Sequence, residues 1–151
     1  EEKGAPPVAT LTWNDSGRFE ARWVYLTVRG SRSVLLRDVQ SLYLPVAHAE
    51  GKFVDRDDGA LQALDSAGQL ALRYTVPSDH TNGKVPYPFN PNGSVAHVAG
   101  LCDQSGRVLG LMPHPERYID RTNHPRWTRE ELPDAGHGLK IFQNAIEYFA
   151  G

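Results

Sequence analysis

The stretch SVAHVAGLCDQSGRVLGLMPHPERY, Ser94 to Tyr118, contains two apolar runs joined by a short polar connection that carries a glycine. This pattern predicts a β-hairpin. The second run ends in a histidine between two prolines, with a glutamate two residues further on. Because proline fixes its own φ and keeps the preceding residue out of the helical region, we expect this segment to be extended. His114 and Glu116 would then point to the same side of the chain.

A histidine and a carboxylate on one side of a stiff segment suit proton transfer. Imidazole takes and returns a proton near neutral pH, and a carboxylate on its other ring nitrogen fixes the tautomer and stabilises the imidazolium. Such a pair is two thirds of a triad of nucleophile, base and orienting acid. It also follows a strand end, where ligands bind if the strand belongs to the parallel part of an open α/β sheet. The alternative is that His114 is a packed or capping residue and Glu116 a solvated turn residue.

The single cysteine is a poor candidate for the nucleophile. Cys102 lies at the turn end of the predicted hairpin, whereas His114 lies beyond the far end of the returning strand. With Arg107 opposite Cys102, seven residues separate the two, or about 23 Å at about 3.3 Å per residue. A nucleophile needs its base within about 3 Å. We therefore expect Cys102 to be a buried structural thiol.

No other residue pattern supplies a nucleophile or a metal site. The serines show no G-x-S-x-G motif, and the histidines show neither H-E-x-x-H nor paired Cys/His spacing. The sequence therefore contains a candidate base and its orienting acid, without a group for them to activate.

Length and composition favour one folded domain. The chain has 151 residues, of which 40% are hydrophobic, and this is enough to form one core. The formal net charge of −2 and the absence of a long apolar run indicate binding to neither nucleic acid nor membrane. One cysteine fits a reducing compartment, so we expect a cytoplasmic protein.

Further elements are predicted on both sides of the hairpin. Apolar and alternating runs predict strands over residues 22–28, 42–48 and 69–76, and the proline-rich segment 77–94 predicts an irregular functional loop. The last run predicts an amphipathic helix. Its buried stripe would consist of Leu139, Phe142, Ala145, Ile146 and Phe149.

Several segments together resemble one family. VLGLMPHPER is similar to the closing catalytic motif of the class I, or triad, glutamine amidotransferases. Four ordered segments resemble the glutaminase component of phosphoribosylformylglycinamidine synthase, over about nine tenths of the chain. They are NDSGRFEARWV (14–24), LPVAHAEGKFV (44–54), YPFNPNGS (87–94) and HVAGLCDQSGRVLGLMPHPER (97–117).

The resemblance implies a glutaminase of purine biosynthesis with a flavodoxin-like α/β fold. In this family a cysteine thiolate attacks the side-chain amide of glutamine, a glutamyl thioester forms as ammonia leaves, and water then releases glutamate. The synthase subunit or domain uses the ammonia, with ATP and Mg, to convert formylglycinamide ribonucleotide into the amidine. The glutaminase domain itself needs no cofactor or metal. On this resemblance His114 is the general base and acid, and Glu116 orients it.

The sequence lacks two motifs of the family. The nucleophile elbow, G-x-C-N-G-x-Q, belongs upstream of the segment at 14–24, and the glycine-rich oxyanion loop belongs further upstream. We therefore expect residues 1–151 to be the C-terminal part of a single amidotransferase domain, incomplete at its N-terminal side and inactive alone. Such a part would expose a sheet edge and apolar surface. The alternative is a non-catalytic docking or regulatory module derived from this domain.

The segment LPVAHAEGKFV suggests a substrate subsite. In related amidotransferases the corresponding backbone lies beside the α-amino and carboxylate groups of glutamine, so we predict that His48, Ala49 and Glu50 bind substrate. The family usually has glycine at the position of Ala49, and an added methyl group could crowd that approach. Alternatively, His48 and Glu50 are polar residues that end a strand. NPNGS (90–94) is either a tight surface turn or a contact with the synthase.

Overall fold

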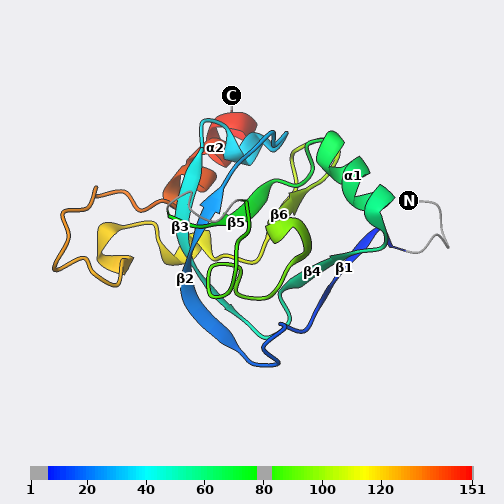
Figure 1. The fold of residues 1–151 in the computed structure, drawn as a ribbon. Coiled ribbons are helices and arrows are strands. Elements are labelled where there is room, and N and C mark those ends of the chain that lie inside the picture. Colours follow the sequence, from blue (N-terminus) through cyan, green and yellow to red (C-terminus); the bar gives the residue numbers. More distant parts are fainter. Residues whose placement is uncertain (1–6, 78–82, 151) are drawn as a thin grey trace.

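The computed structural model describes residues 7–77 and 83–150 of the chain. Its centre is a five-stranded sheet in the order β3-β2-β5-β6-β7, and a second sheet pairs two short strands, β1 with β4 (Figure 1). The strands are β1 (Ala9–Thr12), β2 (Glu20–Thr27), β3 (Ser41–His48), β4 (Lys52–Asp55), β5 (Leu72–Thr75), β6 (Val98–Cys102) and β7 (Leu109–Leu111). All pairings between these strands are antiparallel. Within the described residues, the strand that precedes His114 is therefore not part of a parallel sheet, so its end is not the ligand-binding position of an open α/β sheet.

The predicted hairpin is present as β6 and β7, and the runs at 22–28 and 42–48 form most of β2 and β3. The third predicted strand is shorter than expected, because only Leu72–Thr75 of residues 69–76 is regular strand. The register between β5 and β6 shifts between Leu72 and Arg73. Such a shift interrupts the regular ladder, although Gln69 and Ala71 still form backbone hydrogen bonds to β6 residues.

The core lies on the faces of the large sheet. Leu70, Leu72 and Tyr74, which the alternation of residues 69–76 predicts to share one face, are all buried. Leu72 and Tyr74 belong to the main cluster, which also contains Leu26 and Leu44 from the neighbouring strands, whereas Leu70 packs in a smaller cluster.

The described residues contain two α-helices, of which α1 (Asp58–Ser66) packs against β4 and α2 (Leu139–Ala150) against the 3₁₀ turn Val34–Leu36. Helix α1 lies between β4 and β5, and the side chain of Asp57 caps it by accepting from the N–H of Ala60 at 2.8 Å. Helix α2 is the predicted C-terminal helix (Figure 1). Among the residues that the structure describes, no helix is long and apolar enough to cross a membrane.

The predicted buried stripe of α2 was largely wrong. Ile141 and Asn144 are buried, whereas Phe142, Ile146 and Phe149 have exposed fractions of 40%, 67% and 63%. The amide of Asn144 donates to the carbonyls of residues 35 and 37, at 3.0 and 2.8 Å. These bonds turn the side of the helix that carries Ile141 and Asn144 inward, and they leave Phe142, Ile146 and Phe149 on the outer side.

Candidate functional site

The sheet is curled, so that its two edge strands meet at His114. Strand β7 ends at Leu111 on one edge, and three residues later the N–H of His114 donates to the carbonyl of Pro45 in β3, on the other edge, at 2.8 Å. Three residues of extended chain span about 10 Å at most. Pro45 has no N–H of its own, which suits a free edge. His114 is therefore anchored where the two edges come together.

The structure brings His114 and Glu116 together as predicted. Nδ1 of His114 lies 2.7 Å from Oε1 of Glu116. His114 is extended, with φ −101° and ψ 92°. The expected extended course beyond it was wrong, because Pro115–Arg117 is a turn of 3₁₀ helix in which the N–H of Tyr118 donates to the carbonyl of Pro115 at 3.1 Å. This turn brings the carboxylate back to the imidazole, so Nδ1 carries a proton that the carboxylate accepts, and in the neutral imidazole the free electron pair is on Nε2.

His48 is fixed by Asn14, a buried residue that sequence analysis did not single out. The amide nitrogen of Asn14 donates to the carbonyls of Arg18 and His48, both at 2.8 Å, so its orientation is settled. Its oxygen accepts from the N–H of Gly51 at 3.2 Å and faces Nδ1 of His48 at 3.1 Å. Nδ1 of His48 therefore carries a proton. Among the described residues, Nε2 of His48 is buried without a hydrogen-bond partner.

The charge state of His48 follows from its surroundings. Burial lowers the pKa of His48, and the nearby His114 lowers it further, whereas Glu20 acts in the opposite direction. Because His114 is close enough to lower the pKa of His48, the two imidazoles lie near each other beside β3. His48 is therefore neutral at physiological pH, in the same tautomer as His114.

The other two predicted substrate residues lie in the turn after β3. The carbonyl of Ala49 accepts from the N–H of Asn14 at 2.8 Å, and Ala49 is half-buried. Glu50 is exposed. Gly51 follows, and a Cβ at this position would lie 2.4 Å from the imidazole ring of His48, so the ring packs directly on the glycine backbone. His48 thus ends β3, and Ala49 and Glu50 form the turn that follows it. Asn14 holds this backbone through the carbonyls of His48 and Ala49 and the N–H of Gly51.

The NPNGS segment supports this turn from the other side. Its polar side chains are buried, so the first of the two alternatives, a tight surface turn, was wrong. The amide of Asn92 donates to the carbonyl of Gly51 at 2.6 Å and to the hydroxyl of Tyr74 at 3.1 Å. Ser94 donates its hydroxyl to the oxygen of Asn92 at 2.7 Å and accepts from the N–H of Phe53 at 2.9 Å. Because these groups satisfy one another, the polar segment can be buried.

Cys102 is buried, as expected, with an exposed fraction of 5%. Its partner in β7 is Leu109 and not Arg107, because the hairpin register is two residues further along. Five residues still separate Leu109 from His114, or about 17 Å of extended strand. Burial also raises the pKa of the Cys102 thiol, which disfavours the reactive thiolate.

Comparison with known proteins places the chain in a family. The model of the CobB/CobQ-like glutamine amidotransferase domain matches residues 1–149. Phosphoribosylformylglycinamidine synthase subunit PurQ of Dehalococcoides mccartyi is 45% identical over 140 residues, which are 92% of this chain and 52% of the relative. The corresponding subunit of Methanococcus maripaludis is 34% identical over 152 residues, 94% of this chain and 56% of the relative.

A solved structure agrees with the fold. The structure titled PurLQS from Thermotoga maritima contains a chain that matches with a TM-score of 0.66 and 28% identity, over 93% of this chain and 53% of that chain. The chain thus spans about half the length of these relatives. The match confirms the predicted class I glutamine amidotransferase fold, in which the sheet is curled. The chain belongs to the CobB/CobQ-like glutamine amidotransferase domain family and is of the PurQ type.

Proposed function

We propose that this chain supplies the base and the orienting acid of a glutaminase that provides ammonia to phosphoribosylformylglycinamidine synthase in purine biosynthesis. The observation that carries the proposal is the 2.7 Å contact between Nδ1 of His114 and Oε1 of Glu116, on a loop anchored to β3. Glutamine is then the substrate, and the synthase subunit or domain is the partner.

The geometry suits both halves of the reaction. Nε2 of His114 removes the proton of a cysteine thiol, and the thiolate attacks the amide carbon of glutamine. Glu116 stabilises the imidazolium through Nδ1–H. The imidazolium then gives its proton to the leaving ammonia as the glutamyl thioester forms. In the second half, His114 takes a proton from water as the water oxygen attacks the thioester carbon. The C–S bond then breaks, glutamate is released, and the imidazolium returns its proton to the sulfur, which restores the thiol.

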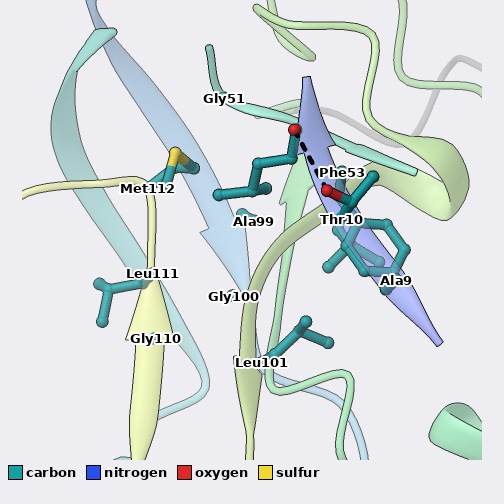
Figure 2. A pocket seen from close by; sticks show the side chains of 12 residues that line it. Ala9, Thr10, Gly51, Phe53, Ala99, Gly100, Leu101, Gly110, Leu111 and Met112 are labelled. Carbon is teal, nitrogen blue, oxygen red and sulfur yellow. Dashed lines mark hydrogen bonds between the residues drawn. The ribbon is translucent and has the colours of Figure 1, made fainter. Parts of the chain in front are cut away.

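The thiol must come from polypeptide other than the described residues, because Cys102 is buried and distant from His114. Two apolar surfaces support docking of such polypeptide. One is a cavity of about 360 Å³ lined by residues of β1, β4, β6 and β7, among which Leu101 and Thr10 are labelled in Figure 2. The other is the exposed apolar stripe of α2. We propose that the remainder of an amidotransferase domain covers both surfaces.

The turn at His48, Ala49 and Glu50 is proposed to bind the backbone groups of glutamine. Asn14 and Asn92 hold its backbone from two sides, which fixes the shape that a ligand would meet. The methyl group of Ala49 narrows the approach relative to glycine. The domain itself uses no metal or cofactor on this proposal; ATP and Mg act in the synthase.

A chimera tests the proposal. The part of the Dehalococcoides mccartyi PurQ that this chain does not match is joined to this chain, and glutamate formation from glutamine is measured. We expect activity, which His114→Ala lowers by about 10²–10⁴-fold. His97→Asn is the matched control. His97 lies in another pocket and has φ 59°, which asparagine adopts readily.

Two outcomes would count against the proposal. Full activity of the His114→Ala chimera would remove His114 from the role of base. An inactive chimera that still binds the synthase would favour the docking or regulatory module in place of a glutaminase.

A further inference from the structure

Gly138 lies against the residue between the two members of the candidate catalytic pair. A Cβ built on Gly138 would be 1.9 Å from the carbonyl oxygen of Pro115, 2.6 Å from its carbonyl carbon and 2.8 Å from its Cα. All three are backbone atoms, so no side-chain rotation could relieve the contact. Gly138 is buried and immediately precedes α2. The start of this helix therefore sets how closely the backbone of Pro115 can approach.

Gly138 belongs to a short segment, Gly136–Gly138, which we call the glycine clasp. The N–H of Gly138 donates to the carbonyl of Tyr118 at 2.8 Å, and the N–H of Gly136 donates to the carbonyl of Ile119 at 3.0 Å. A Cβ on Gly136 would be 2.5 Å from the carbonyl oxygen of Tyr118. The clasp thus holds the backbone of Tyr118 and Ile119, shortly after the catalytic pair, by two hydrogen bonds and one close approach, and it lies against Pro115 within the pair by a second close approach.

The same edge strand holds both the clasp and His114. The N–H of Tyr43 donates to Nδ1 of His137, the middle residue of the clasp, at 3.0 Å. Two residues along β3, the carbonyl of Pro45 accepts from the N–H of His114 at 2.8 Å. Residues two apart in a strand direct their backbone groups to the same edge. The free edge of β3 therefore forms hydrogen bonds both to the clasp and to His114.

We propose that Gly138 is a positioning residue for the His114–Glu116 pair. The absence of a side chain at this position allows the turn Pro115–Arg117 to lie close to the start of α2, and that turn returns the Glu116 carboxylate to the imidazole. Any side chain at 138 displaces the Pro115 backbone by an ångström or more and so separates the pair. The catalytic consequence rests on the proposed function, whereas the positional one does not.

The positional consequence is measured on this chain by NMR. In the wild type, Nδ1–H of His114 is expected to give a downfield proton signal typical of a hydrogen bond to a carboxylate. In Gly138→Ala this signal should shift upfield or disappear by exchange with water. Gly59→Ala is the matched control, since Gly59 also lies at a helix start but is exposed, and its Cβ would meet only the side chain of Asp57, at 3.2 Å. An unchanged signal in a folded Gly138→Ala variant overturns the proposal.

If Gly138→Ala does not fold, as judged by circular dichroism, the His114 signal is measured in His137→Ala instead, which tests whether the clasp positions the pair. It removes the acceptor for the N–H of Tyr43 without introducing a clash. The His114 signal should then broaden or shift in a folded protein; an unchanged signal overturns the proposal.

The catalytic consequence is measured in the chimera. Because misplacement by about 1 Å can cost about a hundredfold in rate, we expect Gly138→Ala to lower kcat at least about tenfold. KM should change less than about threefold, and Gly59→Ala should match the wild type. Unchanged kcat in Gly138→Ala overturns the proposal. An inactive wild-type chimera counts against the proposed function alone, because the NMR result on this chain still reports the position of the pair.

Discussion

The side-chain oxygen of Asn14 lies 3.1 Å from Nδ1 of His48, whereas at His97 the group facing Nδ1 is the amide nitrogen of Asn90, at 3.2 Å. Both asparagines are fixed by backbone partners, because the nitrogen of Asn90 also donates to the carbonyl of Ser94 and its oxygen accepts the N–H of Ser94. The two histidines are therefore held in opposite tautomers. Like His114, His48 offers the electron pair of Nε2; His97 offers a proton there.

We predict that ¹⁵N NMR of this chain near pH 7.5 will separate the histidines into these two groups. His48 should be protonated on Nδ1 and His97 on Nε2. The difference between the ¹⁵N shifts of Nδ1 and Nε2 should therefore have opposite signs in the two residues. Assignment comes from His48→Asn and His97→Asn. A His48 resonance with the proton on Nε2 would contradict the role given to Asn14.

We predict that Asn14→Ala destabilises the chain by about 2–4 kcal/mol. The variant loses one buried and two partly buried hydrogen bonds at once and leaves the Gly51 N–H and two carbonyls without this partner, each bond being worth about 1 kcal/mol. Urea unfolding followed by circular dichroism measures the change. Asn123→Ala is the control, because Asn123 accepts only exposed backbone bonds at 3.1 and 3.2 Å, and it should cost less than about 1 kcal/mol. Equal losses would show that Asn14 does not hold the turn.

We predict that Glu116→Gln lowers kcat of the chimera at least about a hundredfold with little change in KM. The amide keeps the size of the side chain, but it no longer stabilises the imidazolium that forms when His114 takes a proton. Arg117→Gln is the control, since Arg117 is exposed and contacts Glu116 only at 3.7 Å. A loss below about threefold for Glu116→Gln would favour the reading of Glu116 as a solvated turn residue.

Much of this architecture could be predicted because it depends on local pattern. The hairpin β6–β7 and strands β2 and β3 follow from apolar runs and turn residues, and helix α2 follows from its period. The pairing of His114 with Glu116 was also predicted, although through extended backbone and not through the turn that the structure shows. Proline restricts the backbone before it, but it does not determine whether the chain turns after it.

The features that were missed depend on distant partners. Asn144 determines which side of α2 faces inward, through carbonyls more than a hundred residues away. NPNGS is polar but buried, because the carbonyl of Gly51 accepts from Asn92 and the N–H of Phe53 donates to Ser94. Gly138 is adjacent to Pro115 only in three dimensions. A pattern read along one chain contains no signal for such contacts.

We predict that the free energy of unfolding falls as the pH decreases from about 6.5. Burial lowers the pKa of both His48 and His97 in the folded chain from the ordinary value of 6.5. Between the folded and unfolded pKa values the unfolded state binds more protons, so stability increases with pH in this window and is lost as the pH falls through it. Urea titrations at pH 7.5, 6.5 and 5.5 measure the slope. His97→Asn should reduce it, and an equal slope in this variant would contradict burial of a neutral His97.

We predict that Ile146→Lys weakens association with the complementary part of the domain more than it affects this chain alone. Ile146 has an exposed fraction of 67% on the apolar stripe of α2, so lysine should change the free energy of unfolding by less than about 0.5 kcal/mol. Burying that charge against a partner is costly, so binding to the separately expressed remainder of the Dehalococcoides mccartyi PurQ should weaken at least about tenfold. Glu147→Lys is the control, since Glu147 is exposed on the same helix and forms an ion pair with Arg37. Equal binding by Ile146→Lys and the wild type would remove α2 from the proposed docking surface and leave the cavity over β6 and β7 as its remaining part.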